Sequence, residues 1–201
     1  MASPPLPSFD ELLAEMAAAE RRDGWLIECQ QRGWYLALNR QLISALSASL
    51  RCLADSPVLE VCAGDGRLAA ALTTAGVPVI ATDADPATTT RVEGISARDA
   101  LLRFRPTAVV GSFVPLDAGV DQDVLRAASV QFYLVLNARI GGAFGSPALW
   151  QTPGWRAQRR DDIARWMITR HDVWVAGHAT PLIQHGEAWL MGRESPCRAR
   201  S

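Results

Sequence analysis

The chain has 201 residues, of which 49% are hydrophobic and 20% are charged, and its formal net charge is −1. This composition is that of a folded globular domain with a full core, and it excludes a disordered chain. Because there is no basic field and no apolar run of membrane length, we expect neither a nucleic acid nor a membrane as partner.

The cysteines and the amino-terminal residues predict the cellular compartment. Met1–Pro7 lacks the basic segment and apolar core of a signal peptide. The four cysteines have the spacing of neither a disulfide framework nor a zinc site: Cys29, Cys52, Cys62 and Cys197. We therefore expect a cytoplasmic protein with one domain over residues 1–201, divided into a flexible arm at 1–7, helices within 8–53 and a core at 57–192.

Two helices are predicted before the core. Ser8 and Glu11 have the spacing of a capping box, which opens an amphipathic helix at about 9–20. A longer helix is predicted over Trp34–Leu53, because its apolar residues recur on one face: Leu36, Leu42, Ile43, Leu46 and Leu50.

The segment 58–86 has the pattern of a β-turn-α-β unit with a carboxylate at the tip of each strand. The apolar run at Val58–Val61 predicts a buried strand, and the Gly64-x-Gly66 turn allows positive φ and close approach of a ligand. A helix at about 66–75 is long enough for a parallel crossover to a second strand that ends at Asp83. Ligands bind at this edge of open α/β sheets, where a carboxylate can accept hydrogen bonds from ribose hydroxyls.

Strands and helices continue to alternate after Asp83, which predicts an α/β fold with a doubly wound, mostly parallel sheet. The last two strands have no helix between them, so we expect an antiparallel C-terminal hairpin at one edge of the sheet. The predicted elements are a short helix from Asp85, a strand at Thr90–Glu93, a helical segment at Asp99–Phe104, a strand at Thr107–Phe113, a helix at Asp121–Ala128, a strand at Val130–Asn137, a helix at Pro153–Thr169, and strands at Asp172–Ala176 and Ala188–Met191.

Glu60, the Gly64-x-Gly66 turn and Asp83 together resemble the cofactor-binding half of class I S-adenosylmethionine (SAM)-dependent methyltransferases. The resemblance covers roughly Trp34 to Met191 and implies a seven-stranded Rossmann-like sheet with SAM as cofactor and S-adenosylhomocysteine as product. It places Glu60 near the methionine amino group and Asp83 at the ribose. The remaining cofactor contacts that it implies are Ala63, Gly64, Gly66, Ala84, Asp99, Ala100 and Gly111.

Two further signatures concern the adenine and the acceptor. The resemblance implies that Asp99 meets the adenine amine and the Ala100 N–H meets the ring, although Asp99 also fits a helix cap. The chain reads Gly111–Pro115 where enzymes that methylate amines of nucleic acids or protein glutamine carry Asp/Asn-Pro-Pro-Tyr. This stretch is more similar to small bacterial methyltransferase-like proteins, as is Gly141–Gly145. We therefore expect a small-molecule acceptor, of the kind found in specialised metabolism, beside Ser112 and Phe113.

Aromatic and histidine residues of the C-terminal third are candidates for the acceptor pocket. Trp150 and Trp155 are predicted to line the mouth of the site, with a place in the core as the alternative. His178 and His185 are candidates for a general base. Their spacing with His171 matches no established zinc pattern, so we expect no metal.

Two other interpretations stay open. Gly64-x-Gly66-x-x-Ala69 also fits the dinucleotide fingerprint, which would indicate an NAD(P)-binding oxidoreductase. A methyltransferase fold that binds SAM or S-adenosylhomocysteine without methyl transfer, as a cyclase or a regulator, is the second alternative. Glu60 favours SAM over the dinucleotide, because a dinucleotide offers that carboxyl group no amino partner.

Overall fold

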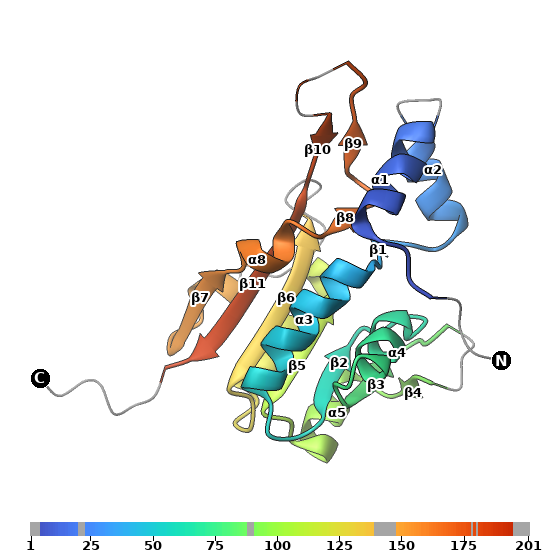
Figure 1. Cartoon of the computed structure of the whole chain (residues 1–201). Helices are drawn as coiled ribbons and strands as arrows, with labels where there is room; N and C mark the ends of the chain where they lie inside the picture. Colours follow the sequence, from blue (N-terminus) through green and yellow to red (C-terminus); the bar gives the residue numbers. More distant parts are fainter. Residues whose placement is uncertain are drawn as a thin grey trace, which may run out of the picture.

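The structure is a computed structural model that describes residues 5–19, 23–87, 91–138, 148–177, 179 and 181–194. Its centre is a seven-stranded sheet in the order β4-β3-β2-β5-β6-β11-β7 (Figure 1). The five strands from β4 to β6 are parallel, and β11 runs antiparallel to both β6 and β7. The strands are β2 (Val58–Val61), β3 (Val79–Asp83), β4 (Glu93–Gly94), β5 (Ala108–Ser112), β6 (Phe132–Ala138), β7 (Trp155–Arg159) and β11 (Gly186–Arg193).

Helices pack on both faces of this sheet, so the predicted doubly wound, mostly parallel fold is confirmed. One face is covered by α3 (Arg40–Leu53), α4 (Arg67–Thr74) and α8 (Asp161–Ala164). The other face is covered by α5 (Ala97–Phe104), α6 (Val120–Arg126), which follows a short 3-10 turn at Leu116–Ala118, and α7 (Ala148–Gln151). No helix within the described residues is long and apolar enough to span a membrane.

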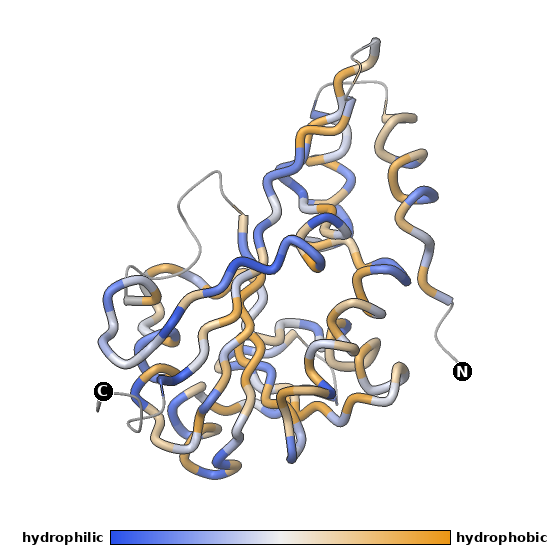
Figure 2. The backbone as a smooth tube through the Cα atoms, turned by 60° about the vertical axis from the view of Figure 1, so that its left-hand side comes forward, coloured by the Kyte–Doolittle hydropathy of each residue, from blue (hydrophilic) through white to orange (hydrophobic). Residues whose placement is uncertain are grey.

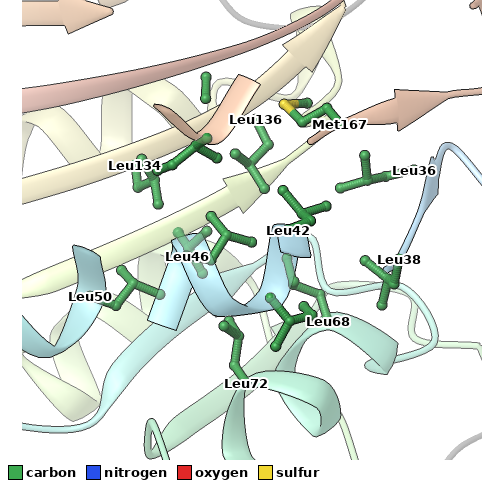
Figure 3. Close-up of a cluster of buried hydrophobic side chains, with 14 of the residues drawn as sticks. Leu36, Leu38, Leu42, Leu46, Leu50, Leu68, Leu72, Leu134, Leu136 and Met167 are labelled. Carbon is green, nitrogen blue, oxygen red and sulfur yellow. The ribbon is translucent and has the colours of Figure 1, made fainter. Parts of the chain in front are cut away.

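The core lies between the sheet and these helices. Figure 3 shows leucines of α3 and α4 meeting residues of β6 and the segment after α8, and Leu42, Leu46, Leu72 and Leu136 are each 0% exposed. The hydropathy pattern along the backbone agrees, because the central strands are strongly hydrophobic (Figure 2). Burying each such side chain stabilises the fold by roughly 1.5–3 kcal/mol.

The first two helices and two small sheets lie at the end of the large sheet toward which β6 points (Figure 1). Helices α1 (Phe9–Ala18) and α2 (Gly24–Gln31) pack beside β1 (Leu36–Ala37), which pairs with β8 (Ile168–Thr169). The Trp25 indole donates to the Thr169 carbonyl at 2.8 Å, which ties α2 to β8. A second small sheet pairs β9 (Val173–Trp174) with β10 (Leu182–Ile183).

The amino-terminal helices follow the sequence prediction in part. The capping box at Ser8 and Glu11 is present and opens α1. The predicted helix Trp34–Leu53 is too long, because α3 begins only at Arg40, where the Asn39 side chain accepts from the Leu42 N–H at 2.8 Å. Gly33, with φ at +66°, turns the chain out of α2, so residues 34–39 are not helical and include the short strand β1.

The predicted helix over Pro153–Thr169 is wrong. Trp155–Arg159 forms the edge strand β7, and only Asp161–Ala164 is helical before β8. The side chains of β7 alternate weakly in polarity, and its backbone is satisfied by long-range pairing with β11, which periodicity does not reveal. The antiparallel C-terminal strand is present, but β11 inserts between β6 and β7 instead of pairing with residues 172–176. No helix forms at described residues 84–87.

Candidate functional site at the carboxyl edge of the sheet

The glycine turn after β2 lies against the tip of β3. The Ala63 N–H donates to the Thr82 carbonyl at 3.0 Å, and the turn passes through positive φ at Gly64 (+58°) and Gly66 (+73°). A Cβ on Gly66 would approach the Val92 side chain at 2.7 Å, so that glycine is required by packing. A Cβ on Gly64 would meet no described protein atom within 4 Å, which leaves bare backbone open to a ligand.

Asp83 braces this turn with its side chain. One carboxylate oxygen accepts the Gly64 N–H at 2.8 Å, and the other accepts the Asp85 N–H at 2.9 Å. Each carboxylate oxygen has capacity for a further hydrogen bond. The half-buried Asp83 can therefore hold the turn and accept ligand hydroxyls at once, while Ala84 beside it is exposed.

Glu60 lies buried beneath the turn at 2% exposure. Its carboxyl group accepts the Ala69 N–H in the first turn of α4, and its Oε2 has no hydrogen-bond partner among the described residues. Burial, assisted by the nearby Asp65 and Asp83 carboxylates, raises the pKa of Glu60 to about 8. An unpartnered buried carboxyl oxygen is the kind of group that a ligand ammonium satisfies.

The residues predicted to contact adenine are already used by helix α5. Asp99 and Ser96 form a reciprocal cap, with the Ser96 hydroxyl 2.7 Å from Asp99 Oδ2, and the Ala100 N–H donates to the Ser96 carbonyl at 2.9 Å. The N-cap of α5 is therefore Ser96, and Asp99, for which a helix cap is the alternative role, lies inside the first turn and hydrogen-bonds to that cap. Gly94 pairs with Asp83, so Ile95 and Ser96 come directly after the sheet edge, and Asp99 lies one helical turn further on.

The segment after β5 forms the opposite side of the site. A Cβ on Gly111 would lie 2.5 Å from the Tyr133 hydroxyl, which gives Gly111 a packing role in addition to its predicted backbone contact with the cofactor. Ser112 is half-buried, and Phe113 has φ at +56° and donates its N–H to the Leu136 carbonyl at 2.9 Å. The Tyr133 hydroxyl donates to the buried Asp121 at 2.7 Å.

Two aromatic residues that the sequence pattern assigns to a helix lie between these two sides. The guanidinium groups of Arg32 and Arg67 lie over the Trp34 ring, at 4.6 and 5.1 Å from its centroid, and Arg67 is the first residue of α4. Tyr35 packs on Phe113, with ring centroids 5.8 Å apart. The Trp34-Tyr35 pair thus contacts both sides. The signal that could have revealed it is Gly33, which ends a helix more readily than it precedes one.

The structure does not bring the two predicted pocket tryptophans to this edge. Trp155 begins β7 opposite Arg193, at the amino edge of the parallel strands, where its indole donates to the Leu125 carbonyl at 3.1 Å. Trp150 lies in α7, 54% exposed, with its ring centroid 4.8 Å from that of Trp189 in the middle of β11. Their pocket role is predicted from a loop after the fifth strand and a helix over Pro153–Thr169. The structure has α7 and β7 in these positions.

The two candidate bases are not both described. His178 lies outside the described residues, as does the Gly141–Gly145 segment. His185 is half-buried, and its backbone N–H donates to Asp172 at 2.8 Å. Within the described ranges, no three histidine, cysteine or acidic side chains gather as a metal site would require.

Two hollows on the described surface lie away from the glycine turn. One, of about 600 Å³, lies between α3 and α8 and is bordered by Cys52, Arg160 and Trp166. The other, of about 310 Å³, is bordered by Arg159, Gln184 and His185. Neither touches Gly64 or Asp83, so the candidate site is defined by the contacts at the sheet edge rather than by surface shape.

Comparison with solved structures finds a similar fold in methyltransferases. The 23S rRNA methyltransferase ErmE is 15% identical, with a TM-score of 0.50 over 80% of this chain and 70% of that chain. The magnesium protoporphyrin IX methyltransferase ChlM from Synechocystis PCC 6803, solved with bound SAM, is 13% identical, with a TM-score of 0.50 over 77% of this chain and 79% of that chain. No family profile matches the sequence, and no curated protein matches it.

Proposed function

We propose that the chain binds SAM at the carboxyl edge of its sheet and transfers the methyl group to a small molecule. The observation that carries the proposal is the hydrogen bond between the Asp83 carboxylate and the Gly64 N–H. It joins an acceptor for ribose hydroxyls to a stretch of open backbone, at the edge where α/β sheets bind ligands. The fold that the chain shares with ErmE and ChlM supports this placement.

The charges at the edge favour SAM over a dinucleotide. Asp65 lies on the turn after β2 and Asp83 at the end of β3, Glu60 is buried in β2 beneath them, and the nearby cation Arg67 is paired with Asp65 at 2.6 Å. A pyrophosphate would meet repulsion from the aspartates, whereas the ammonium and sulfonium of SAM would be attracted. The electrostatics therefore argue against the NAD(P) alternative.

Each residue of the edge has a distinct task toward the cofactor. We assign the ribose hydroxyls to Asp83, the amino group to the unpartnered Oε2 of Glu60, and the open backbone approach to Gly64. SAM supplies an activated methyl group when bound, so the chain has mainly to align the acceptor and exclude water. Trp34 and Tyr35 serve the exclusion of water, because they contact both sides of the site.

The acceptor class is inferred from the chain itself. Solved structures with this fold include one enzyme named for rRNA and one named for a porphyrin, so the fold does not choose between them. A net charge of −1 provides no field to gather a polyanion. The exposed Tyr35 and the buried Phe113 on which it packs suit a compact partly apolar acceptor.

Calorimetric titration with SAM, S-adenosylhomocysteine and NAD tests the cofactor. We expect both SAM-type ligands to bind and NAD to give no heat. Asp83→Ala should weaken SAM binding by at least about a hundredfold, since hydrogen bonds to a charged group contribute roughly 1.5–3 kcal/mol each. Asp83→Asn keeps an oxygen for the Gly64 N–H and should lose less.

Asp85→Asn is the matched control for Asp83. Asp85 is exposed, and its backbone N–H, which the substitution preserves, is the group that donates to Asp83. Its SAM affinity should equal that of the wild type. If Asp83→Ala binds SAM as tightly as the wild type, Asp83 does not contact the cofactor and the proposal is wrong.

Methyl transfer is tested separately from binding. A metabolite mixture incubated with SAM carrying a labelled methyl group should yield a labelled product that mass spectrometry detects. Binding of SAM without any labelled product from small molecules, nucleic acid or protein would favour the non-methylating alternative, a cyclase or a regulator.

A further inference from the structure

A second cluster of side chains extends the site beyond Phe113. The Arg170 guanidinium lies on the face of the Tyr35 ring, with 3.8 Å between Cζ and the ring centroid. Tyr35 in turn packs on Phe113, the first residue after β5. Arg170 therefore lies one aromatic ring away from the end of the strand that borders the cofactor edge.

The backbone fixes both members of this stacked pair. Leu36 pairs with Thr169 in the β1–β8 ladder, and the Arg170 N–H donates to the Tyr35 carbonyl at 3.1 Å. The chain just after β8 is held by the buried Asp172, which accepts the Thr169 N–H at 2.9 Å, the Thr169 hydroxyl at 2.8 Å and the His185 N–H at 2.8 Å. These bonds fix the backbone at Arg170, so that its side chain starts from a defined position beside Tyr35.

Arg170 also lacks an acidic partner among the described residues. Its Nε donates to His171 Nε2 at 3.3 Å, and within the described part of the chain neither a carboxylate nor a carbonyl meets its two terminal nitrogens. A partly desolvated guanidinium whose two terminal nitrogens lack a partner among the described residues is suited to bind a carboxylate or a phosphate through two hydrogen bonds. The other half-buried arginines of the described chain are neutralised or bonded: Arg67 to Asp65, Arg160 to Asp162, and Arg193 to backbone carbonyls.

We propose that Arg170 binds an anionic group of the acceptor, a carboxylate or a phosphate, and so selects an anionic small molecule as the substrate. Tyr35 holds the guanidinium plane, and His171 occupies its Nε so that the terminal nitrogens face the ligand. This inference rests on the proposed function, since it assigns the acceptor of the same site. Arg170 is a specificity-determining residue in this arrangement.

The test uses the full-length protein saturated with S-adenosylhomocysteine and three probes of similar size: benzoate, phenyl phosphate and the neutral benzamide. Ligand-observed NMR measures their binding. We expect at least one anion to bind more tightly than benzamide, and Arg170→Gln to weaken that anion at least tenfold while the S-adenosylhomocysteine affinity is unchanged. Preference for benzoate or for phenyl phosphate identifies which anion the site accepts.

Arg165→Gln is the matched control. Arg165 also lies over an aromatic ring, 5.3 Å from the centroid of Trp166, but it is exposed and borders the hollow between α3 and α8. Its anion binding should equal that of the wild type. Arg170→Lys, which keeps the charge and the stem, replaces Arg170→Gln if the latter fails to fold, and we expect it to lose part of the affinity because it lacks the fork.

The outcomes separate this inference from the proposed function. If S-adenosylhomocysteine does not bind the wild type, the proposed function fails and the inference fails with it. If it binds but the anions bind no better than benzamide, or bind the Arg170 variants as well as the wild type, the inference alone is overturned. If a short RNA binds the wild type more tightly than the probes, and Arg170→Gln loses that affinity, the proposal of a small-molecule acceptor is overturned. Arg170 would then bind the phosphate backbone of an RNA acceptor.

Discussion

The two sides of the proposed site are built differently. The cofactor side comes from one contiguous segment, 58–86, in which backbone groups and two carboxyl groups meet through hydrogen bonds at sequence separations of about twenty residues or fewer. The acceptor side joins Tyr35, Phe113 and Arg170, which come from three distant parts of the chain. In the proposed function a local motif therefore binds the cofactor, whereas the residues proposed to bind the acceptor are brought together by tertiary pairing.

A substitution at Gly64 should have the largest effect on the cofactor side. Gly64→Val should abolish measurable SAM binding, because the added side chain enters the open space that the ligand uses and resists a φ of +58°. Calorimetry of the variant against SAM checks this. Near-native affinity would show that the turn does not touch the ligand, and the cofactor side would then not be a local motif.

Gly154 provides a control that separates backbone strain from loss of the ligand's space in Gly64→Val. Gly154 has φ at +79°, and a Cβ added there would meet no described atom within 4 Å, but it lies beside β7 at the opposite edge. Gly154→Val should lower the melting temperature about as much as Gly64→Val, since a residue in this region costs roughly 1–3 kcal/mol. It should bind SAM like the wild type.

Trp155 lies at the amino edge of the parallel strands, away from both sides of the proposed site, so its substitution should affect stability and not ligand binding. Trp155→Ala should destabilise the fold by about 3 kcal/mol, because the ring packs against the core. The Arg193 guanidinium also lies 4.5 Å from the ring centroid, and the indole N–H donates to the Leu125 carbonyl. SAM affinity should be unchanged. Denaturant unfolding measures the loss, and a turnover defect at unchanged stability would restore the pocket role that the sequence pattern predicts for this residue.

Trp150→Ala is the companion variant. Its side chain is 54% exposed and touches Trp189, so truncation should cost about 1 kcal/mol or less. A larger loss than that of Trp155→Ala would contradict the packing described for both residues.

The two sides also differ in how far the sequence predicts them. The β-turn-α-β unit is predictable because glycine conformation, strand burial and helix length are local properties, and they correctly place Asp83 at the end of the second strand. The helix caps show the limit of such reasoning. The pair Ser8 and Glu11 is identifiable, but the sequence does not distinguish an adenine contact at Asp99 from a residue that hydrogen-bonds to the Ser96 cap of α5.

The acceptor side could not be predicted for a physical reason. Residues 155–159 are a strand only because β11 provides a pairing partner, and Arg170 meets Tyr35 only because β8 pairs with β1. Both pairings join segments that are distant in the sequence. The hydrogen bonds between them produce no periodic pattern of hydrophobic residues in either segment. Sequence reasoning therefore assigns the tryptophans to the mouth and misses Trp34, Tyr35 and Arg170.

A smaller effect concerns the protonation of Glu60. Its pKa of about 8 in the folded protein exceeds the ordinary value of 4.5, so between these values the folded state binds more protons than the unfolded state. Stability from this group is therefore fully present below about pH 4.5 and is lost as the pH rises through 8. Melting temperatures between about pH 5 and pH 9 should fall less steeply for Glu60→Gln than for the wild type, and parallel curves would show that Glu60 does not titrate in this way.

Whether SAM lies against Gly64 and Asp83 is decided by a crystal structure of the protein grown with S-adenosylhomocysteine. We predict electron density for the ligand with its ribose hydroxyls on the Asp83 carboxylate, its amino group toward Glu60 and its thioether toward the stacked rings of Tyr35 and Phe113. Density in the hollow between α3 and α8, or a ligand that leaves Asp83 and Gly64 uncontacted, would contradict this placement.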